Sequence, residues 1–348
     1  MNDIKGISLF AGAGGMDVGF KNAGVEVIVA NEIDKFALQT YQLNHPTTEL
    51  LRGDINDYIA EFEKYDNIDL VFGGPPCQGF SVAGKMNPND ERSQNIWRFL
   101  DVVEKSKPKA FVMENVKALA TLSKWEDIRV SFVEKAESLG YCCKYVVLNA
   151  SDFGVTQNRE RVFFIGSKRK YDIESLNKQF ESKKCSPKTI RQLFSQLPSA
   201  GTEGNELTCT AKITFASNPV LRKSPYAGML FNGMGRPINL EGVCSTLPAS
   251  MGGNKTPIID NNLLNKPNSI DWIVKYHEDL RNNTITPEYG IAPRFLRRLT
   301  IAEVALIQSF PHDYKFAGSK SAIYTQIGNA VPCSLAEVVA RVVIENCI

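Results

Sequence analysis

The residues that could carry chemistry in this chain begin with a cysteine in an unusual setting. Cys77 stands within FGGPPCQGFS, directly after two prolines and just past two glycines. Proline removes a backbone donor and fixes φ, and glycine admits conformations that other residues avoid, so neither a helix nor a strand would continue here. A thiol on such a loop is a candidate nucleophile if its thiolate is accessible, although a lone cysteine is otherwise a small core residue.

Two further motifs add an acid and two cations. Glu114 and Asn115 follow an apolar run in MENV, and Arg159 and Arg161 lie in QNRERVFFIG, just before another apolar run. Arginines two positions apart on an extended segment project to the same face. Together with Cys77, these residues make a nucleophile, a carboxylic acid and a pair of cationic clamps.

Alternating strands and helices would position these groups. Apolar runs predict strands at residues 4–10, 25–32, 68–74, 109–115 and 161–167. Helical periodicity follows the first strand up to residue 20 and the second over residues 35–44. Strands that alternate with helices indicate a parallel, doubly wound α/β sheet, in which ligands bind at the carboxyl ends of the strands.

A glycine turn follows the first strand, in SLFAGAGGMDVGF. Gly12, Gly14 and Gly15 would let the backbone approach a nucleotide-like ligand at a helix N-terminus. The dinucleotide fingerprint of an oxidoreductase would have a third glycine where Asp17 stands, which counts against that class. Acidic residues at the next two strand ends, in NEID and GDI, suit ribose hydroxyls and a further polar edge. The pattern favours an adenosine-containing cofactor that is not rich in phosphate.

Composition is that of a globular chain of 348 residues, with 43% hydrophobic and 22% charged residues. No apolar run approaches the ~18 residues that would span a membrane, and the N-terminus lacks a signal-peptide pattern. We therefore expect a cytoplasmic protein without a membrane partner. The eight cysteines are scattered, with only three histidines, so neither a disulfide framework nor a metal site is expected.

The net charge of +2 is unevenly divided along the chain. Residues 181–318 hold 16 Lys and Arg against 11 Asp and Glu, a net of +5, which leaves −3 for the remainder. This asymmetry is compatible with a polyanionic partner for that segment, or with an ordinary solvated surface.

In sequence order, these and the later motifs resemble one family along the whole chain. The motifs are SLFAGAGG, GGPPCQGFS, MENV, QNRERVFFIG, RRLTIAEVALIQSFP and QIGNAVP. They are similar to the successive motifs of the cytosine-5 DNA methyltransferases. The resemblance implies a Rossmann-like S-adenosylmethionine-dependent methyltransferase sheet with a smaller, loop-rich target-recognition domain. It also implies a discontinuous catalytic domain, residues 1–180 plus 319–348, with residues 181–318 as the small domain.

The resemblance assigns roles to the candidate catalytic residues. The Cys77 thiolate would add to carbon 6 of a cytosine, so that carbon 5 can take the methyl group. Glu114, with a pKa raised by burial, would contact ring nitrogen 3 and the exocyclic amine. Arg159 and Arg161 would orient the base and the cysteine loop, and Asn115 would organise that loop.

By the same resemblance, the cofactor is S-adenosyl-L-methionine, with S-adenosyl-L-homocysteine as its product. The predicted cofactor contacts come from the strand ends and from the C-terminal motif: Phe10, Gly12, Gly14, Glu32, Ile33, Asp54, Ile55, Pro76, Asn329, Ala330 and Val331. Ile33 departs from the family, because some members stack an aromatic residue on adenine there. Ser93 is a second departure, since the loop that closes over DNA often has glycine at that position.

A cytosine inside a duplex cannot reach Cys77, so we expect it to be flipped into a pocket at a cost of a few kcal/mol. The loop-forming basic segment is the candidate for holding the double-stranded DNA, and Thr246-Leu247 resembles the TL pair of family recognition regions. The predicted DNA contacts are Gln78, Ser81, Arg92, Arg236, Thr246, Leu247, Asn254 and Lys255.

Three readings of the function remain from the sequence. The first is a sequence-specific DNA cytosine methyltransferase of a prokaryotic restriction-modification system, acting as a monomer. The second is the tRNA-methylating branch of the family, although the variable region has no Cys-Phe-Thr signature. The third is a non-catalytic DNA-binding regulator, which would be expected to have lost Cys77, Glu114 or Arg161, and all three are present.

Overall fold

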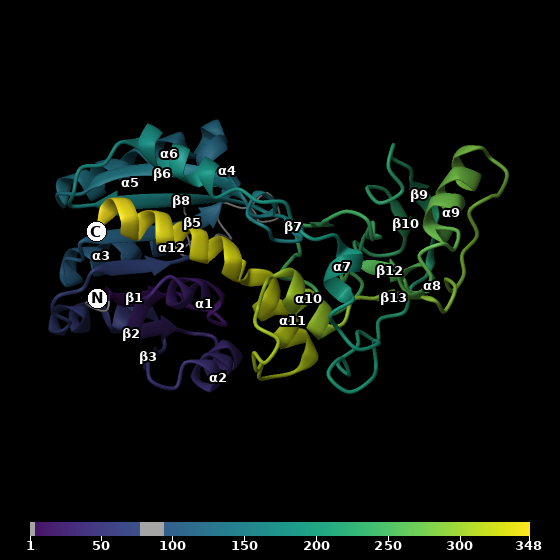
Figure 1. Ribbon diagram of the computed structural model, residues 1–348, viewed down its shortest axis with the longest axis horizontal. Coiled ribbons are helices and arrows are strands. Elements are labelled where there is room, and N and C mark those ends of the chain that lie inside the picture. Colours follow the sequence, from purple (N-terminus) through teal and green to yellow (C-terminus); the bar gives the residue numbers. More distant parts are fainter. Residues whose placement is uncertain (1–3, 77–93) are drawn as a thin grey trace.

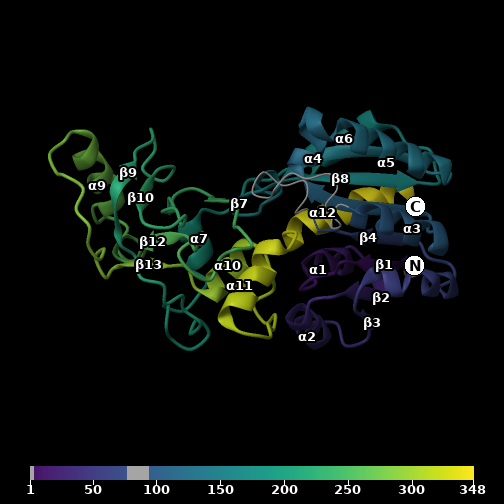
Figure 2. The ribbon, with the colours of Figure 1, turned by 180° about the vertical axis from the view of Figure 1, so that it is seen from behind.

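The computed structural model describes residues 4–76 and 94–348. Figure 1 shows an elongated molecule, with a helix-flanked sheet at one end and a loop-rich part at the other. Between them lie β7 (Gln157–Asn158) and the helices α10 (Ile301–Ile307) and α11 (Lys320–Asn329), as the view from behind also shows (Figure 2). The α/β fold class predicted from the sequence is confirmed.

The sheet has seven strands in the order β3-β2-β1-β4-β5-β8-β6. Their bounds are β1 Ile4–Leu9, β2 Val25–Glu32, β3 Glu49–Arg52, β4 Leu70–Gly73, β5 Ala110–Val116, β6 Cys142–Asn149 and β8 Glu160–Ser167. The strand order reverses between β1 and β4, which pair in parallel with Leu9 opposite Gly73. The carboxyl ends at such a switch point form the crevice in which α/β sheets bind ligands.

One strand runs against the prediction of an all-parallel sheet. Strand β8 pairs antiparallel with both of its neighbours, β5 and β6. Residues 150–159 connect β6 to β8 without a crossover helix, and so short a connection returns the chain in the opposite direction. As a result, β8 begins at the carboxyl edge of the sheet, with Arg161 opposite Val116.

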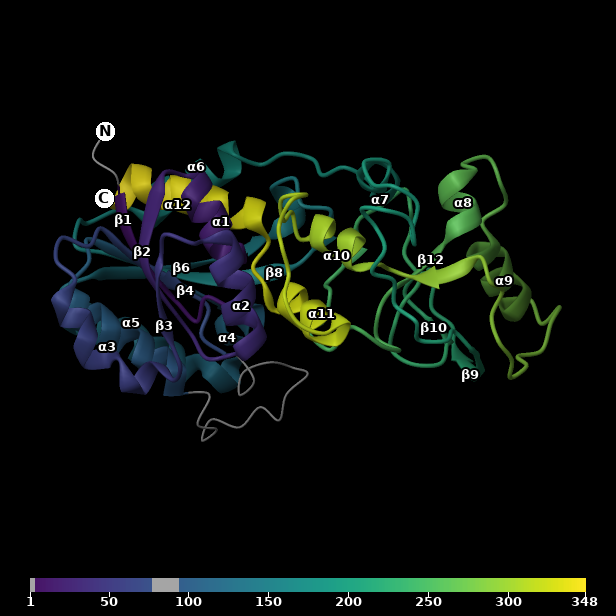
Figure 3. The same cartoon turned by 90° about the horizontal axis from the view of Figure 1, so that it is seen from below.

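Helices cover both faces of the sheet (Figure 3). One face packs against α3 (Asn95–Ser106), α4 (Lys117–Thr121) and α5 (Glu126–Ser138). The other packs against α1 (Gly15–Asn22), α6 (Ile173–Ser182) and α12 (Cys333–Cys347). Neighbouring residues such as Phe111 and Val112 enter opposite cores, as the alternation of side chains along a strand requires.

The C-terminal helix returns to the sheet beside α1. Gly19 in α1 faces the Cys333 carbonyl with no room for a Cβ atom, so the two helices pack at close range. Among the described residues, the stretch Lys320–Cys347 is long and apolar enough by composition to cross a membrane, but 61% of its most apolar window is buried. Its apolar character is that of a core helix.

Local signals explain where α2 begins. Helix α2 (Lys35–Asn44) has the bounds predicted for it, because the Asp34 side chain accepts hydrogen bonds from the backbone N–H groups of Phe36 and Ala37. It packs beside α11 at the edge of the sheet.

The loop-rich part consists of short elements around two smaller cores. Its elements are α7 Ile190–Phe194, β9 Phe215–Val220, β10 Met229–Phe231, β11 Cys244–Ser245, β12 Ile258–Asp260, α8 Asn261–Asn265, α9 Trp272–Arg281 and β13 Leu296–Arg298. The strands form only two-stranded ladders over residues 183–319, all of which the structure describes. One of these ladders joins β11 to β7 in parallel and so connects the loop-rich part to the sheet end.

Candidate active site

A buried ion pair stands at the carboxyl edge of the sheet. Glu114 near the end of β5 accepts a hydrogen bond from Arg161 at the start of β8, with Nε 2.8 Å from Oε1. The two side chains are 12% and 14% exposed. The antiparallel direction of β8 brings them together, because it sets the first residues of β8 beside the last residues of β5.

The environment of Glu114 opposes the charge of its carboxylate. Burial raises the pKa of the carboxyl, and the nearby Arg161 and Arg159 lower it by less. Gly74 lies under the other carboxylate oxygen, where a Cβ atom would be only 2.7 Å from Oε2. Glycine at that position is what allows the acid to sit against the chain that leads to Cys77.

Asn115 holds that same stretch of chain. Its side chain is 1% exposed, and Nδ2 donates to the Pro75 carbonyl at 3.3 Å while Oδ1 accepts from the Val116 amide at 2.9 Å. Pro75 and Pro76 lead directly to the predicted nucleophile. Five residues singled out from the sequence lie outside the described residues: Cys77, Gln78, Ser81, Arg92 and Ser93.

Arg159 and Arg161 do not form the pair of clamps that their spacing predicted, because they bind different partners. The side chain is 2% exposed, and its guanidinium donates to the backbone carbonyls of Leu247 at 3.2 Å, Gly328 at 3.0 Å and Asn329 at 3.4 Å. It therefore holds two distant segments together, while its charge still acts on Glu114. Arg161 is the arginine that contacts the acid directly.

The turn after β1 has a left-handed backbone at two of its glycines and also at Phe10, where a residue with a side chain rarely adopts it. Phe10, Gly12 and Gly14 all have positive φ, at 53°, 58° and 80°. Glu32 at the end of β2 closes this turn, since Oε2 accepts from the Gly12 amide at 2.7 Å. Its Oε1 accepts from the next two backbone amides, Ile33 at 2.8 Å and Asp34 at 2.7 Å.

The other predicted cofactor residues surround this turn. Ile33 is 63% exposed beside the carboxylate of Glu32, while Ile55 is buried at the end of β3. Asp54 caps the short turn that follows it, accepting from the Asn56 amide at 2.9 Å. From the C-terminal motif, Val331 and Ala330 pack on Gly15, and Asn329 is exposed.

Sequence reasoning missed two residues that lie behind the glycine turn. His45 Nε2 lies 3.2 Å from the Tyr314 hydroxyl, which donates to the Ala13 carbonyl inside the turn. Both groups lie 2.7 Å from the position that a Cβ atom on Gly14 would take, so only glycine fits there. Burial lowers the pKa of His45 to about 4, so the ring is neutral near pH 7. Tyr314 comes three residues after the motif RRLTIAEVALIQSFP, which ends at Pro311.

The residues predicted to contact DNA fall into two groups. Arg236, Thr246, Asn254 and Lys255 are at least partly exposed, and the Thr246 hydroxyl donates to the Asn158 carbonyl at 2.7 Å. Arg236 and Thr246 line a groove of about 490 Å³, together with Tyr226. Leu247 is 1% exposed and packs in the core, so its side chain is not available to a duplex.

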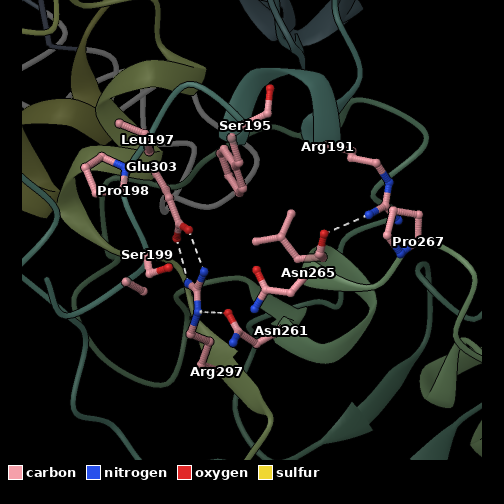
Figure 4. A pocket seen from close by; sticks show the side chains of 13 residues that line it. Arg191, Ser195, Leu197, Pro198, Ser199, Asn261, Asn265, Pro267, Arg297 and Glu303 are labelled. Atoms are coloured by element: carbon pink, nitrogen blue, oxygen red, sulfur yellow. Dashed lines mark hydrogen bonds and ion pairs between the residues drawn. The ribbon is translucent and has the colours of Figure 1, made fainter.

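A second hollow, of about 430 Å³, lies within the loop-rich part (Figure 4). Its charged groups are paired with each other or with the backbone. Arg297 binds Glu303 at 2.6 and 2.8 Å and Asn261 at 2.9 Å, and Arg191 donates to the carbonyls of Leu263 and Leu264. These contacts stabilise the fold around α7, α8 and α10. We therefore regard this hollow as structural and the carboxyl edge of the sheet as the candidate active site.

A profile of the C-5 cytosine-specific DNA methylase family matches residues 4–345. The chain belongs to this family. It is accordingly a DNA cytosine-5 methyltransferase, as the resemblance of its motifs predicted.

Relatives of this methyltransferase match it over nearly its whole length. The Type II methyltransferase M1.HphI of Haemophilus parahaemolyticus is 33% identical, over 97% of this chain and 86% of the relative. The Type II methyltransferase M.FnuDI of Fusobacterium nucleatum is 31% identical, over 97% of this chain and 93% of the relative.

Solved structures share the fold of this methyltransferase. A protein described as a DNA modification methyltransferase encoded within an E. coli prophage has a TM-score of 0.66 at 23% identity, over 98% of this chain and 99% of that one. The S. pombe Dnmt2 methyltransferase has a TM-score of 0.67 at 18% identity, with the same coverage. Within residues 4–76 and 94–348, no group of three or more His, Cys, Asp and Glu side chains could hold a metal ion.

Proposed function

We propose that this methyltransferase acts on carbon 5 of a flipped-out cytosine in a short duplex DNA site, with S-adenosyl-L-methionine as methyl donor, and that it protects DNA in a restriction-modification system. The observation that carries the proposal is Glu114. It is a buried acid with a raised pKa, bound by Arg161 beside the stretch that leads to Cys77. The names of the relatives, Type II methyltransferases, support the biological context.

The residues at the switch point fit an adenosine-containing cofactor. Within residues 4–76 and 94–348, and apart from its chain neighbours, no heavy atom lies within 4 Å of the position that a Cβ on Gly12 would take, so the turn is open there. The Glu32 carboxylate accepts three backbone N–H groups, and a carboxylate has about four acceptor positions, which leaves one for a ribose hydroxyl. The exposed Ile33 side chain offers an apolar surface for adenine.

The remaining cofactor contacts are assigned by position. Asp54 and Ile55 would meet the adenine edge, and Phe10, Gly14, Pro76, Asn329, Ala330 and Val331 would enclose the rest of the molecule. When bound, S-adenosyl-L-methionine supplies a methyl group on a sulfonium and leaves as S-adenosyl-L-homocysteine.

At the base, Cys77 would add as a thiolate to carbon 6 and so make carbon 5 nucleophilic. Protonated Glu114 would donate to ring nitrogen 3, which draws the charge of the adding thiolate into the ring. Once carbon 5 has been methylated, its proton leaves to a base and the Cys77 sulfur is eliminated, which restores the ring and the free thiolate. Arg161 holds Glu114 in place, and Asn115 holds the chain before Cys77 through the Pro75 carbonyl.

Double-stranded DNA is the proposed partner of residues 181–318, which carry the net charge of +5. Arg236, Thr246, Asn254 and Lys255 are the candidate contacts there, with Gln78, Ser81 and Arg92 contributed from the catalytic side. Phosphate contacts position such a protein, while contacts to base edges specify the sequence. We assign the catalytic domain to residues 1–180 plus 319–348, and propose a cytoplasmic monomer.

The test is the substitution Cys77→Ser, with Cys185→Ser as control because Cys185 is an exposed free cysteine. Transfer of labelled methyl groups to DNA and retention of DNA in a gel-shift assay are measured on both variants. We expect Cys77→Ser to lose methyl transfer and to keep DNA binding, and Cys185→Ser to keep both. Full activity of Cys77→Ser would refute the proposed chemistry.

A further inference from the structure

Two buried glutamines meet at the junction between the sheet and the loop-rich part. Gln157 in β7 and Gln308 after α10 are each 0% exposed, and Gln157 Nε2 donates to Gln308 Oε1 at 2.7 Å. Neither side chain has a role in the chemistry proposed above. A buried amide is costly unless all of its polar atoms are paired, so the partners of this pair indicate what it does.

Each glutamine uses its other polar atom on a different segment. Gln157 Oε1 accepts from the Leu247 backbone amide at 2.9 Å, on the recognition side. Gln308 Nε2 donates to the carbonyls of Ile327 at 2.7 Å and Ala330 at 3.1 Å, on the cofactor side. These partners fix the orientation of both side-chain amides. The Leu247 N–H group requires the oxygen of Gln157, and the two carbonyls require the NH₂ group of Gln308.

The neighbours of Gln157 bind the same recognition residues. The Asn158 carbonyl accepts from the Thr246 hydroxyl at 2.7 Å, and Arg159 donates to the Leu247 carbonyl at 3.2 Å. Arg159 also reaches Gly328, so a second connection runs parallel to the glutamine pair. Three consecutive residues, 157–159, therefore fix the position of the Thr246-Leu247 segment against the start of β8.

We propose that Gln157 and Gln308 form a two-amide relay that positions the Thr246-Leu247 recognition segment relative to the Gly328–Ala330 cofactor segment, and so couples the choice of DNA site to methyl transfer. The proposal rests on the proposed function, which places DNA on one side of the relay and the cofactor on the other. Both glutamines are positioning residues, since they act through the backbone of these segments.

The relay would affect catalysis by positioning the flipped cytosine relative to Glu114. Arg161, which binds Glu114, is two residues after Arg159 in the chain, and Arg159 binds the Leu247 carbonyl. A shift of the recognition segment would therefore change where a flipped cytosine sits over the acid. A displacement of about 1 Å can lower a rate on the order of 100-fold when it spoils the alignment of reacting atoms. Side-chain networks of this kind are also non-additive, because removing one member releases the other.

The experiment compares Gln157→Met, Gln308→Met and the double variant with the wild type. Methionine has nearly the same volume and no amide. The matched control is Gln326→Met, since Gln326 is also buried and bonded at both ends, to the Thr40 hydroxyl at 2.7 Å and to the Ala317 carbonyl at 2.9 Å, but not to the recognition segment. Each protein methylates genomic DNA that lacks 5-methylcytosine, and the rate of transfer of labelled methyl groups at saturating substrate gives kcat. Bisulfite sequencing gives the ratio of methylation at the preferred site to that at sites with one base changed. Thermal unfolding is measured in parallel.

We expect each single relay variant to lower kcat at the preferred site about 10-fold or more and to lower the site ratio, and the double variant to lose no more than either single variant. The control should change thermal stability and leave the site ratio unchanged. The inference is overturned if the relay variants keep the wild-type site ratio, or if the control changes that ratio as much as they do. Failure of the wild type to methylate DNA would instead contradict the proposed function.

If the methionine variants do not fold, Gln157→Asn and Gln308→Asn replace them. Asparagine keeps the amide and shortens it by one methylene, which opens the 2.7 Å contact without placing an apolar group there. The same ratio decides the outcome, since an unchanged ratio in both asparagine variants would also overturn the relay.

Discussion

At the scale of single residues, the site depends on acids whose burial opposes their charge. Glu114 is held against Gly74 and Arg161, and burial still raises the pKa of its carboxyl. Asp17 in α1 is fully buried, with its Oδ1 accepting from the Tyr41 hydroxyl at 2.7 Å. The first acid has a proposed catalytic role, and the second lies in the helix that follows the glycine turn.

The substitution Glu114→Gln should lower kcat by about 10² to 10⁴, because an amide cannot transfer a proton to ring nitrogen 3. Glu160→Gln is the control, since Glu160 is an exposed neighbour on β8 that pairs with Lys117. Because the pKa of Glu114 is raised, its protonated fraction falls as the pH rises through that value. The decline of kcat with rising pH that this causes should be absent from the residual activity of Glu114→Gln, and an identical pH profile in both proteins would contradict the role of the acid.

The substitution Asp17→Asn tests how much the buried carboxylate of Asp17 lowers the free energy of unfolding. Burial raises the pKa of Asp17 from 3.8 to about 6, although the hydrogen bond from Tyr41 opposes the shift. A raised carboxyl pKa means that the folded state binds the proton more tightly, so this group lowers stability as the pH rises from about 3 to about 7. With 1.36 kcal/mol for each pKa unit, the loss is about 3 kcal/mol.

Denaturant unfolding at several pH values measures this effect. The free energy of unfolding of Asp17→Asn should gain on that of the wild type by about 3 kcal/mol between about pH 3 and pH 7. A constant difference between the two proteins over that range would show that Asp17 does not titrate as its burial requires.

At the scale of elements, the sequence predicts what local signals decide. The bounds of β2 and α2 agree with the prediction. Strand β2 is rich in β-branched residues, and Asp34 caps the N-terminus of α2. The direction of β8 was predicted wrongly, since it depends on how the short connection after β6 returns the chain. The partners of Arg159 come from residues 88 to 170 positions away, and no local pattern carries that information.

The glycine turn is likewise supported by an element distant in sequence. Tyr314→Phe removes the hydroxyl that binds the Ala13 carbonyl and His45, and one lost hydrogen bond corresponds to about 0.5–1.5 kcal/mol. We expect the KM for S-adenosyl-L-methionine to rise about 2- to 10-fold with kcat nearly unchanged. Tyr171→Phe is the control, because its hydroxyl binds the Ile165 carbonyl at the other end of the sheet. Equal KM values for Tyr314→Phe and Tyr171→Phe would show that the Tyr314 hydroxyl does not contribute to cofactor binding.

At the scale of the whole molecule, two parts with different charge face the same junction. Residues 181–318 carry +5 and the rest of the chain −3, and β7, α10 and α11 lie where the parts meet (Figure 1). A duplex held by the basic part would present a flipped cytosine to the carboxyl edge of the sheet, where Glu114 lies. The long-range contacts of Gln157, Arg159 and Gln308 join the Thr246-Leu247 segment to the Gly328–Ala330 segment across this junction.

The most direct test of the account is methyl transfer from labelled S-adenosyl-L-methionine to genomic DNA and to bulk tRNA, followed by bisulfite sequencing of the labelled nucleic acid. The account predicts label on DNA, on cytosines confined to one short sequence motif, and loss of that label in Glu114→Gln. Label on tRNA alone, or on neither nucleic acid, would contradict it.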